Sequence, residues 1–119
     1  MFGSEPFLDA RWLPPGAFAA ITDAGVPWRR ERMEAFGKIY IDDVEQERGS
    51  ANPMVDPRLV KGDLQALAAA GNEALYDPET RNAFVYRGMA IGDFAVAGLV
   101  YERALAAGMG KRMSWGAGS

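Results

Sequence analysis

The chain has 119 residues, of which 49% are hydrophobic and 24% charged, and a net charge of −3 at pH 7, which is the balance of a folded protein of single-domain size. It contains no cysteine and no histidine, which excludes disulfides, zinc–thiolate and iron–sulfur centres, histidine metal ligands and triads that use either residue. The acidic balance also disfavours nucleic-acid binding, because such surfaces carry an excess of positive charge.

The first 14 residues are predicted to form an extended arm, because prolines at 6 and 14 interrupt any helix. The large apolar residues of this arm include Phe2, Phe7, Leu8 and Trp12. So short a segment has no core of its own, so it packs either across its own domain or against a neighbouring subunit. No basic stretch precedes these residues, so a secretory signal is not expected, and we expect a cytoplasmic protein without a membrane span.

Residues 15–109 are predicted to form one helical domain, because prolines and glycines occur where helices start and end. The expected helices cover 15–24, 27–48, 57–70, 78–88 and 89–107. The predicted fold class is therefore mainly α, a small single domain of four or five short helices. A flexible C-terminal tail follows at 110–119 and carries Trp115.

The segment 27–48 is ambiguous, because Gly37 interrupts it and Ile39, Tyr40 and Ile41 favour a strand. A short strand near 38–44 is the alternative to one long helix. One helix would place Arg29, Arg30 and Arg32 near its start and Asp42, Asp43, Glu45 and Glu47 near its end. The helix macrodipole prefers the opposite order, so we hypothesise a head-to-tail contact in which the basic end of one copy meets the acidic end of the next. Two separate elements would remove the conflict.

No pattern predicts a catalytic residue, a metal site or a cofactor. The four acids at 42–47 do not have the spacing of an EF-hand loop, so a solvated or partner-facing surface is expected. The arginines beside Trp28 alternate with Glu31 and Glu34, which favours ion pairs over phosphate binding. Lys111 is followed by Arg112, where a phosphate-binding loop requires serine or threonine.

The last expected helix carries a regular apolar stripe. Its members are Ile91, Phe94, Gly98, Tyr101 and Leu105. Small residues at Gly88, Gly92, Ala95 and Gly98 also recur near helical spacing. Such a pattern is typical of close packing, either within the domain or between subunits.

The function predicted from these features is a non-enzymatic structural or assembly subunit of a multi-copy complex. Small virion proteins, such as the connector, decoration and scaffolding proteins of phage heads and tails, fit this description. Its partners would be copies of itself or neighbouring structural proteins, reached through the arm, the charged segment and the tail. The predicted interaction residues are Phe2, Phe7, Leu8, Trp12, Trp28, Arg29, Arg30, Arg32, Asp42, Asp43, Glu45, Glu47 and Trp115. The alternative function is a small acidic regulatory or inhibitory protein-binding module, and no motif identifies a family.

Overall fold

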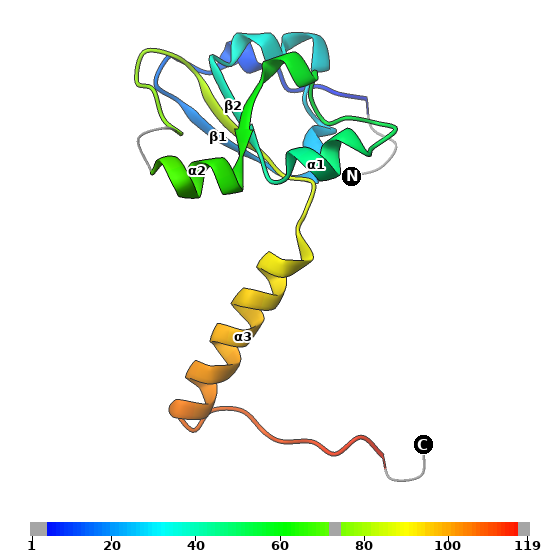
Figure 1. Ribbon diagram of the computed structural model, residues 1–119, viewed down its shortest axis with the longest axis vertical. Helices are drawn as coiled ribbons and strands as arrows, with labels where there is room; N and C mark the ends of the chain where they lie inside the picture. Colours follow the sequence, from blue (N-terminus) through cyan, green and yellow to red (C-terminus); the bar gives the residue numbers. More distant parts are fainter. Residues whose placement is uncertain (1–4, 72–74, 117–119) are drawn as a thin grey trace. The chain divides into compact units, whose positions relative to one another are not determined.

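The computed structural model describes residues 5–71 and 75–116, and the chain divides into two compact units, Met1–Gly88 and Met89–Ser119. We call them unit 1 and unit 2. Unit 1 contains a parallel sheet with short helices, and unit 2 contains one long helix (Figure 1). The fold is therefore α/β, and the prediction of a mainly α domain is wrong.

The sheet of unit 1 has four parallel strands in the order β1-β4-β2-β3. The strands are β1 (Phe18–Ile21), β2 (Lys38–Ile41), β3 (Val60–Asp63) and β4 (Asn82–Val85). The α-helices are α1 (Val44–Arg48) and α2 (Leu64–Ala70) in unit 1 and α3 (Ala90–Ala106) in unit 2. Short 3-10 helices are η1 (Ala10–Trp12), η2 (Asp23–Gly25), η3 (Arg30–Ala35) and η4 (Pro57–Leu59).

The core of unit 1 lies on one face of the sheet. Ile21, Val85 and Ile41 lie side by side across β1, β4 and β2, and all three are buried. The same core is completed by Ala10, Met33, Phe36, Ile39, Met54, Val55 and Ala83. Because strand side chains alternate between faces, Ala20, Phe84 and Tyr40 form a row on the opposite face.

The strands explain why three predicted helices are wrong. The expected helix at 15–24 is β1 followed by η2, and the one at 78–88 contains β4. The segment 27–48 is η3, β2 and α1, so the strand near 38–44 is the form that the chain adopts. All four residues of β4 are buried, and β4 lies between β1 and β2 in the sheet. Its three apolar residues in a row, Ala83, Phe84 and Val85, carry neither the helical nor the strand period.

Two predictions about helices are confirmed in whole or in part. Of the helix expected at 57–70, only α2 is α-helical, since η4 and β3 precede it. The helix expected at 89–107 is α3, and it ends as predicted at Gly108. Gly108 has a φ of +66°, its N–H donates to Leu105 O at 3.1 Å, and the N–H of Met109 donates to Ala104 O at 2.8 Å. These bonds form a Schellman motif, which satisfies carbonyls at the end of the helix. No helix in the described part of the chain is long and apolar enough to cross a membrane.

Candidate functional site

The described part of the arm packs across its own unit. The N–H groups of Phe7 and Leu8 both donate to Pro27 O at 2.9 Å, and that of Arg29 donates to Leu8 O at 2.8 Å. Leu8 and Trp28 form an isolated parallel bridge. These backbone bonds place Phe7 and Leu8 alongside Pro27–Arg29, and η1 follows them within the arm.

The remaining arm residues differ in their surroundings. Phe2 lies outside the described residues. Trp12 is 65% exposed, whereas the ring of Trp28 lies partly buried, 5.7 Å from that of Phe36. Of the predicted arm residues that the structure describes, Trp12 is therefore the most exposed.

The arginines that follow Trp28 do not form a single basic surface. Arg29 and Arg32 are half-buried, and Arg30 is exposed. Arg32 Nε lies 3.9 Å from the carboxylate of Asp9, which is buried and also pairs with Arg11 at 2.7 Å. The hydrogen bond from Arg11 lowers the pKa of Asp9 to about 2. These contacts are ion pairs within unit 1.

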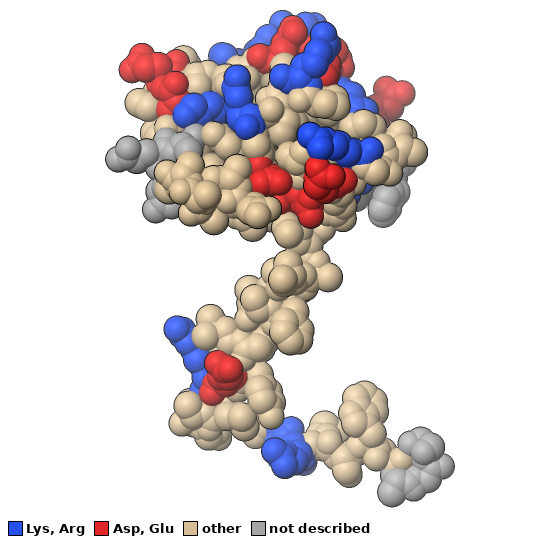
Figure 2. All heavy atoms as spheres, in the orientation of Figure 1, with Lys and Arg blue, Asp and Glu red and all other residues tan. Residues whose placement is uncertain are grey.

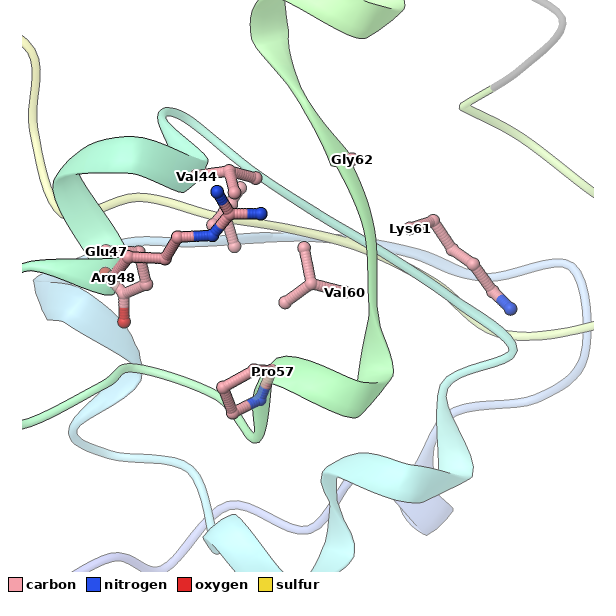
Figure 3. Close-up of a pocket in the computed structure, with 8 residues that line it drawn as sticks. Val44, Glu47, Arg48, Pro57, Val60, Lys61 and Gly62 are labelled. Carbon is pink, nitrogen blue, oxygen red and sulfur yellow. The ribbon is translucent and has the colours of Figure 1, made fainter.

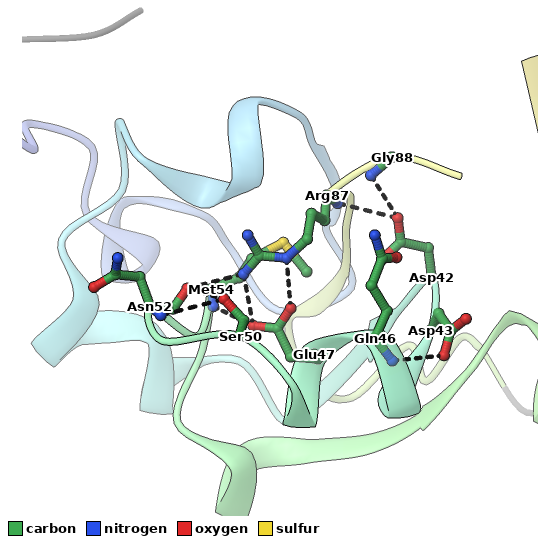
Figure 4. A network of polar contacts seen from close by, with 9 residues as sticks. All are labelled: Asp42, Asp43, Gln46, Glu47, Ser50, Asn52, Met54, Arg87 and Gly88. Atoms are coloured by element: carbon green, nitrogen blue, oxygen red, sulfur yellow. Dashed lines mark hydrogen bonds and ion pairs between the residues drawn. The ribbon is translucent and has the colours of Figure 1, made fainter. Parts of the chain in front are cut away.

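The acids at 42–47 are also used within unit 1, where two of them hold the end of β4 (Figure 4). Asp42 is buried, and its Oδ2 accepts the N–H groups of Arg87 at 3.1 Å and Gly88 at 2.7 Å. Glu47 is buried too, and its carboxylate accepts from Arg87 Nε at 2.9 Å and Nη2 at 3.1 Å. Arg87 also donates to Asn52 O at 2.9 Å.

The ionisation of Glu47 follows from this network. Burial by itself would raise the pKa of Glu47, but hydrogen bonds from the Arg87 side chain and the Met54 N–H outweigh it and lower that pKa overall. Glu47 is therefore held as a carboxylate paired with Arg87. Sequence reasoning missed Arg87, because its partners Asp42 and Glu47 are 40 or more residues away along the chain and no local pattern marks the contact.

The other two acids of the cluster form contacts within α1. Asp43 accepts the N–H of Gln46 at 3.0 Å and caps the helix, and Glu45 pairs with Arg48 at 2.6 Å on the exposed side. Within residues 5–71 and 75–116, no group of three or more aspartates and glutamates is arranged to hold a metal ion. The structure thus divides the acidic cluster between the contacts of Asp42 and Glu47 with distant residues and the local contacts of Asp43 and Glu45 in α1.

A pocket of about 290 Å³ lies beside α1 and β3 (Figure 3). Its walls are mainly aliphatic, and they are formed by Ile41, Val44, Glu47, Arg48, Pro57, Val60, Lys61 and Gly62. Its carboxylate, Glu47, is already paired with Arg87, and Arg48 is paired with Glu45. The pocket does not bring together the free polar groups that would bind and orient a substrate.

A second apolar hollow lies on the sheet face opposite the core. It is lined by Phe18, Ala20, Leu64, Leu67, Ala68, Gly71, Leu75, Phe84 and Tyr86. None of these side chains is charged, so this surface is suited to contact with apolar groups.

Most of the exposed large apolar residues in the described part of the chain belong to unit 2. No residue of α3 is buried, and most of the helix surface seen in Figure 2 is uncharged. The exposed large apolar residues of α3 and the segment after it are Ile91, Phe94, Val96, Leu99, Val100, Tyr101, Leu105, Met109, Met113 and Trp115. Phe94 is 79% and Trp115 is 97% exposed. Of the predicted interaction residues, Trp115 is thus the one that this surface includes.

The known proteins compared with this chain do not indicate its function. No protein-family model matches the sequence, and no curated protein matches it. A functional conclusion therefore depends on the residues and geometry described above.

Proposed function

We propose that this protein is a non-enzymatic structural subunit of a multi-copy assembly, and that unit 2 joins the copies. The observation that carries the proposal is the apolar surface of α3 and the segment after it, in a unit that buries no residue of its only described helix. Contiguous exposed apolar surface of this kind marks protein–protein contact sites. A helix that is apolar around most of its circumference is normally buried by several neighbours.

The small number of charged residues in α3 supports contacts on more than one side of the helix. Its 17 residues include three charged residues, Asp93, Glu102 and Arg103. At about 100° per residue, Phe94 and Tyr101 lie on one side of the helix and Val96 and Leu99 on the other. Apolar groups on opposite sides need partners on opposite sides, as in an assembly of many copies.

The magnitudes favour the same conclusion. Burying five large apolar side chains contributes on the order of 8–15 kcal/mol. Association costs about 4–15 kcal/mol in lost translational and rotational freedom. Burying one side of α3 would therefore only offset the cost of association, and a stable complex needs both sides of the helix to be buried. A particle built from many small chains, such as a virion, would supply such contacts, with the protein made in the cytoplasm and then incorporated.

The structure changes which segments we expect to make these contacts. The head-to-tail charge contact required one helix over 27–48, and that helix is absent from the described structure. The acids and arginines of this segment are largely engaged within unit 1. We therefore assign the assembly contacts to unit 2.

The test is the mass of the full chain by size-exclusion chromatography with light scattering, at low and high salt. We expect several times the monomer mass of 12.9 kDa, and we expect that mass to persist at high salt, because apolar contacts are not screened. Phe94→Glu combined with Leu105→Glu should reduce the mass to that of a monomer. Trp12→Glu, an exposed position in unit 1, is the matched control and should leave the mass unchanged.

Two results would contradict the proposal. A monomer at every concentration that forms a fixed complex with one other protein would instead identify a regulatory binder. A particle that dissociates with Trp12→Glu, but not with the α3 substitutions, would assign assembly to the arm.

A further inference from the structure

The apolar stripe of α3 has the spacing of a helix–helix contact. Its residues, Ile91, Phe94, Gly98, Tyr101 and Leu105, are separated by three, four, three and four positions. This alternation keeps the residues on one side of a helix and is the pattern along which two helices pack. The four large side chains are all exposed, and a Cβ added at Gly98 would meet no atom within 4 Å.

The stripe reads nearly the same in both directions. From Gly98, an aromatic residue and then an aliphatic residue follow on either side, Phe94 and Ile91 toward the start of the helix and Tyr101 and Leu105 toward its end. A contact between two copies related by a two-fold axis uses the same patch on both, so the patch must be complementary to itself. A stripe with this symmetry suits two helices that run in opposite directions.

We propose that α3 of one copy pairs antiparallel with α3 of a second copy along this stripe, with the two Gly98 residues at the centre of the crossing. The proposal rests on the multi-copy function and names its repeating contact. Gly98 allows the helix axes to approach, since the side chains at the contact set that distance. Phe94 of one copy then lies near Tyr101 of the other, an arrangement that gives two aromatic pairs.

The charges of α3 favour the antiparallel direction. Glu102 borders the stripe, and a parallel pair would place the two Glu102 carboxylates level with each other. An antiparallel pair separates these carboxylates by about 12 Å along the axis, at 1.5 Å per residue.

The size of the stripe explains why a pair would not be the final assembly. Its four large side chains bury on the order of 400 Å² per copy, about half of the roughly 800 Å² that each partner contributes to a stable interface. Val96, Leu99 and Val100 remain on the opposite side of α3, and all are exposed. We assign these residues to the contact between one pair and the next.

The absence of cysteine makes a direct test of orientation possible. Two variants of the full chain are made, Ile91→Cys and Leu105→Cys. Each is expressed alone, and the two are also expressed together with different tags. All samples are then oxidised mildly. Antiparallel pairing predicts intermolecular disulfides in the co-expressed sample, with only background in either variant alone. Equivalent residues at these positions are about 21 Å apart along an antiparallel pair, whereas a disulfide needs Cα atoms about 4.4–6.8 Å apart. Trp12→Cys co-expressed with Leu105→Cys controls for random collisions.

The outcomes separate this inference from the proposed function. Disulfides in each variant alone would show parallel helices and overturn the inference, while a multi-copy mass would leave the proposed function in place. A second pair, Phe94→Cys with Tyr101→Cys, is tested in the same way. If the chain forms a multi-copy particle but neither pair forms a disulfide, the contact lies elsewhere and the inference is overturned. A monomeric unsubstituted chain at every concentration would overturn both.

Discussion

Gly37 is a residue at which unit 1 has no space for a larger side chain. A Cβ at this position would lie 1.9 Å from Thr80 Oγ1 and 2.6 Å from Thr80 Cβ. The backbone cannot move away freely, because the N–H of Gly37 donates to Arg81 O at 2.9 Å, directly before β4. Gly37, which interrupts the helical pattern of 27–48 in the sequence, is thus the point where two segments of the chain approach closely.

We predict that Gly37→Ala lowers the free energy of unfolding by about 1–3 kcal/mol, the usual cost of forcing extra atoms into packed space. Urea unfolding followed by circular dichroism measures this change in the free energy of unfolding. Gly49→Ala is the matched control, because its new Cβ would be 3.6 Å from the nearest atom, an ordinary contact. Equal unfolding midpoints for the two variants would show that Thr80 moves aside without cost.

The pairing of Glu47 with Arg87 makes stability depend on pH. Because the pKa of folded Glu47 is lowered, this pair stabilises the fold above the ordinary value of 4.5. That contribution is lost as the pH falls through the folded pKa. The pKa values of Asp9 and Asp56 are also lowered, to about 2, by hydrogen bonds from Arg11 and Arg58.

We therefore predict a lower urea midpoint at pH 3 than at pH 7. Glu47→Gln should lower the midpoint at pH 7 and reduce the difference between the two pH values. A smaller difference should remain, because the lowered pKa values of Asp9 and Asp56 mean that the unfolded chain takes up more protons at pH 3 than the folded chain does. If the pH dependence were the same with and without Glu47, the pair with Arg87 would not contribute to stability.

Among the elements, α3 is the one most dependent on its neighbours. A lone helix of this length is marginal in water, and each of Gly92 and Gly98 costs about 1 kcal/mol relative to alanine. Tertiary contacts normally supply the missing stability, and unit 2 buries no residue of α3. Contacts between copies should therefore be coupled to helix formation.

We predict that the helical circular dichroism signal at 222 nm decreases on dilution, in step with the loss of mass. The Phe94→Glu, Leu105→Glu variant should show the lower signal at every concentration. A signal that stays constant while the particle dissociates would show that α3 is a stable helix without neighbours.

The elements also show how far local sequence signals extend. The limits of α3 and its end at Gly108 were predictable, because the apolar period and the Schellman glycine act within a few residues. The strands were not predictable, apart from the alternative near 38–44. β4 is buried along its whole length and therefore lacks alternation, and the hydrogen-bond partners of the strands are distant in the sequence.

At the scale of the whole molecule, the sequence by itself determined which chemistries are absent and which helix carries an apolar stripe. The absence of histidine and cysteine is a matter of composition, and the stripe of α3 depends only on spacing along the chain. Only the tertiary structure decided the sheet order, the docking of residues 5–13 on unit 1, and the burial of Asp42 and Glu47 around Arg87. The physical reason is that a carboxylate is exposed or buried according to which distant segment packs against it, and no local period records that contact.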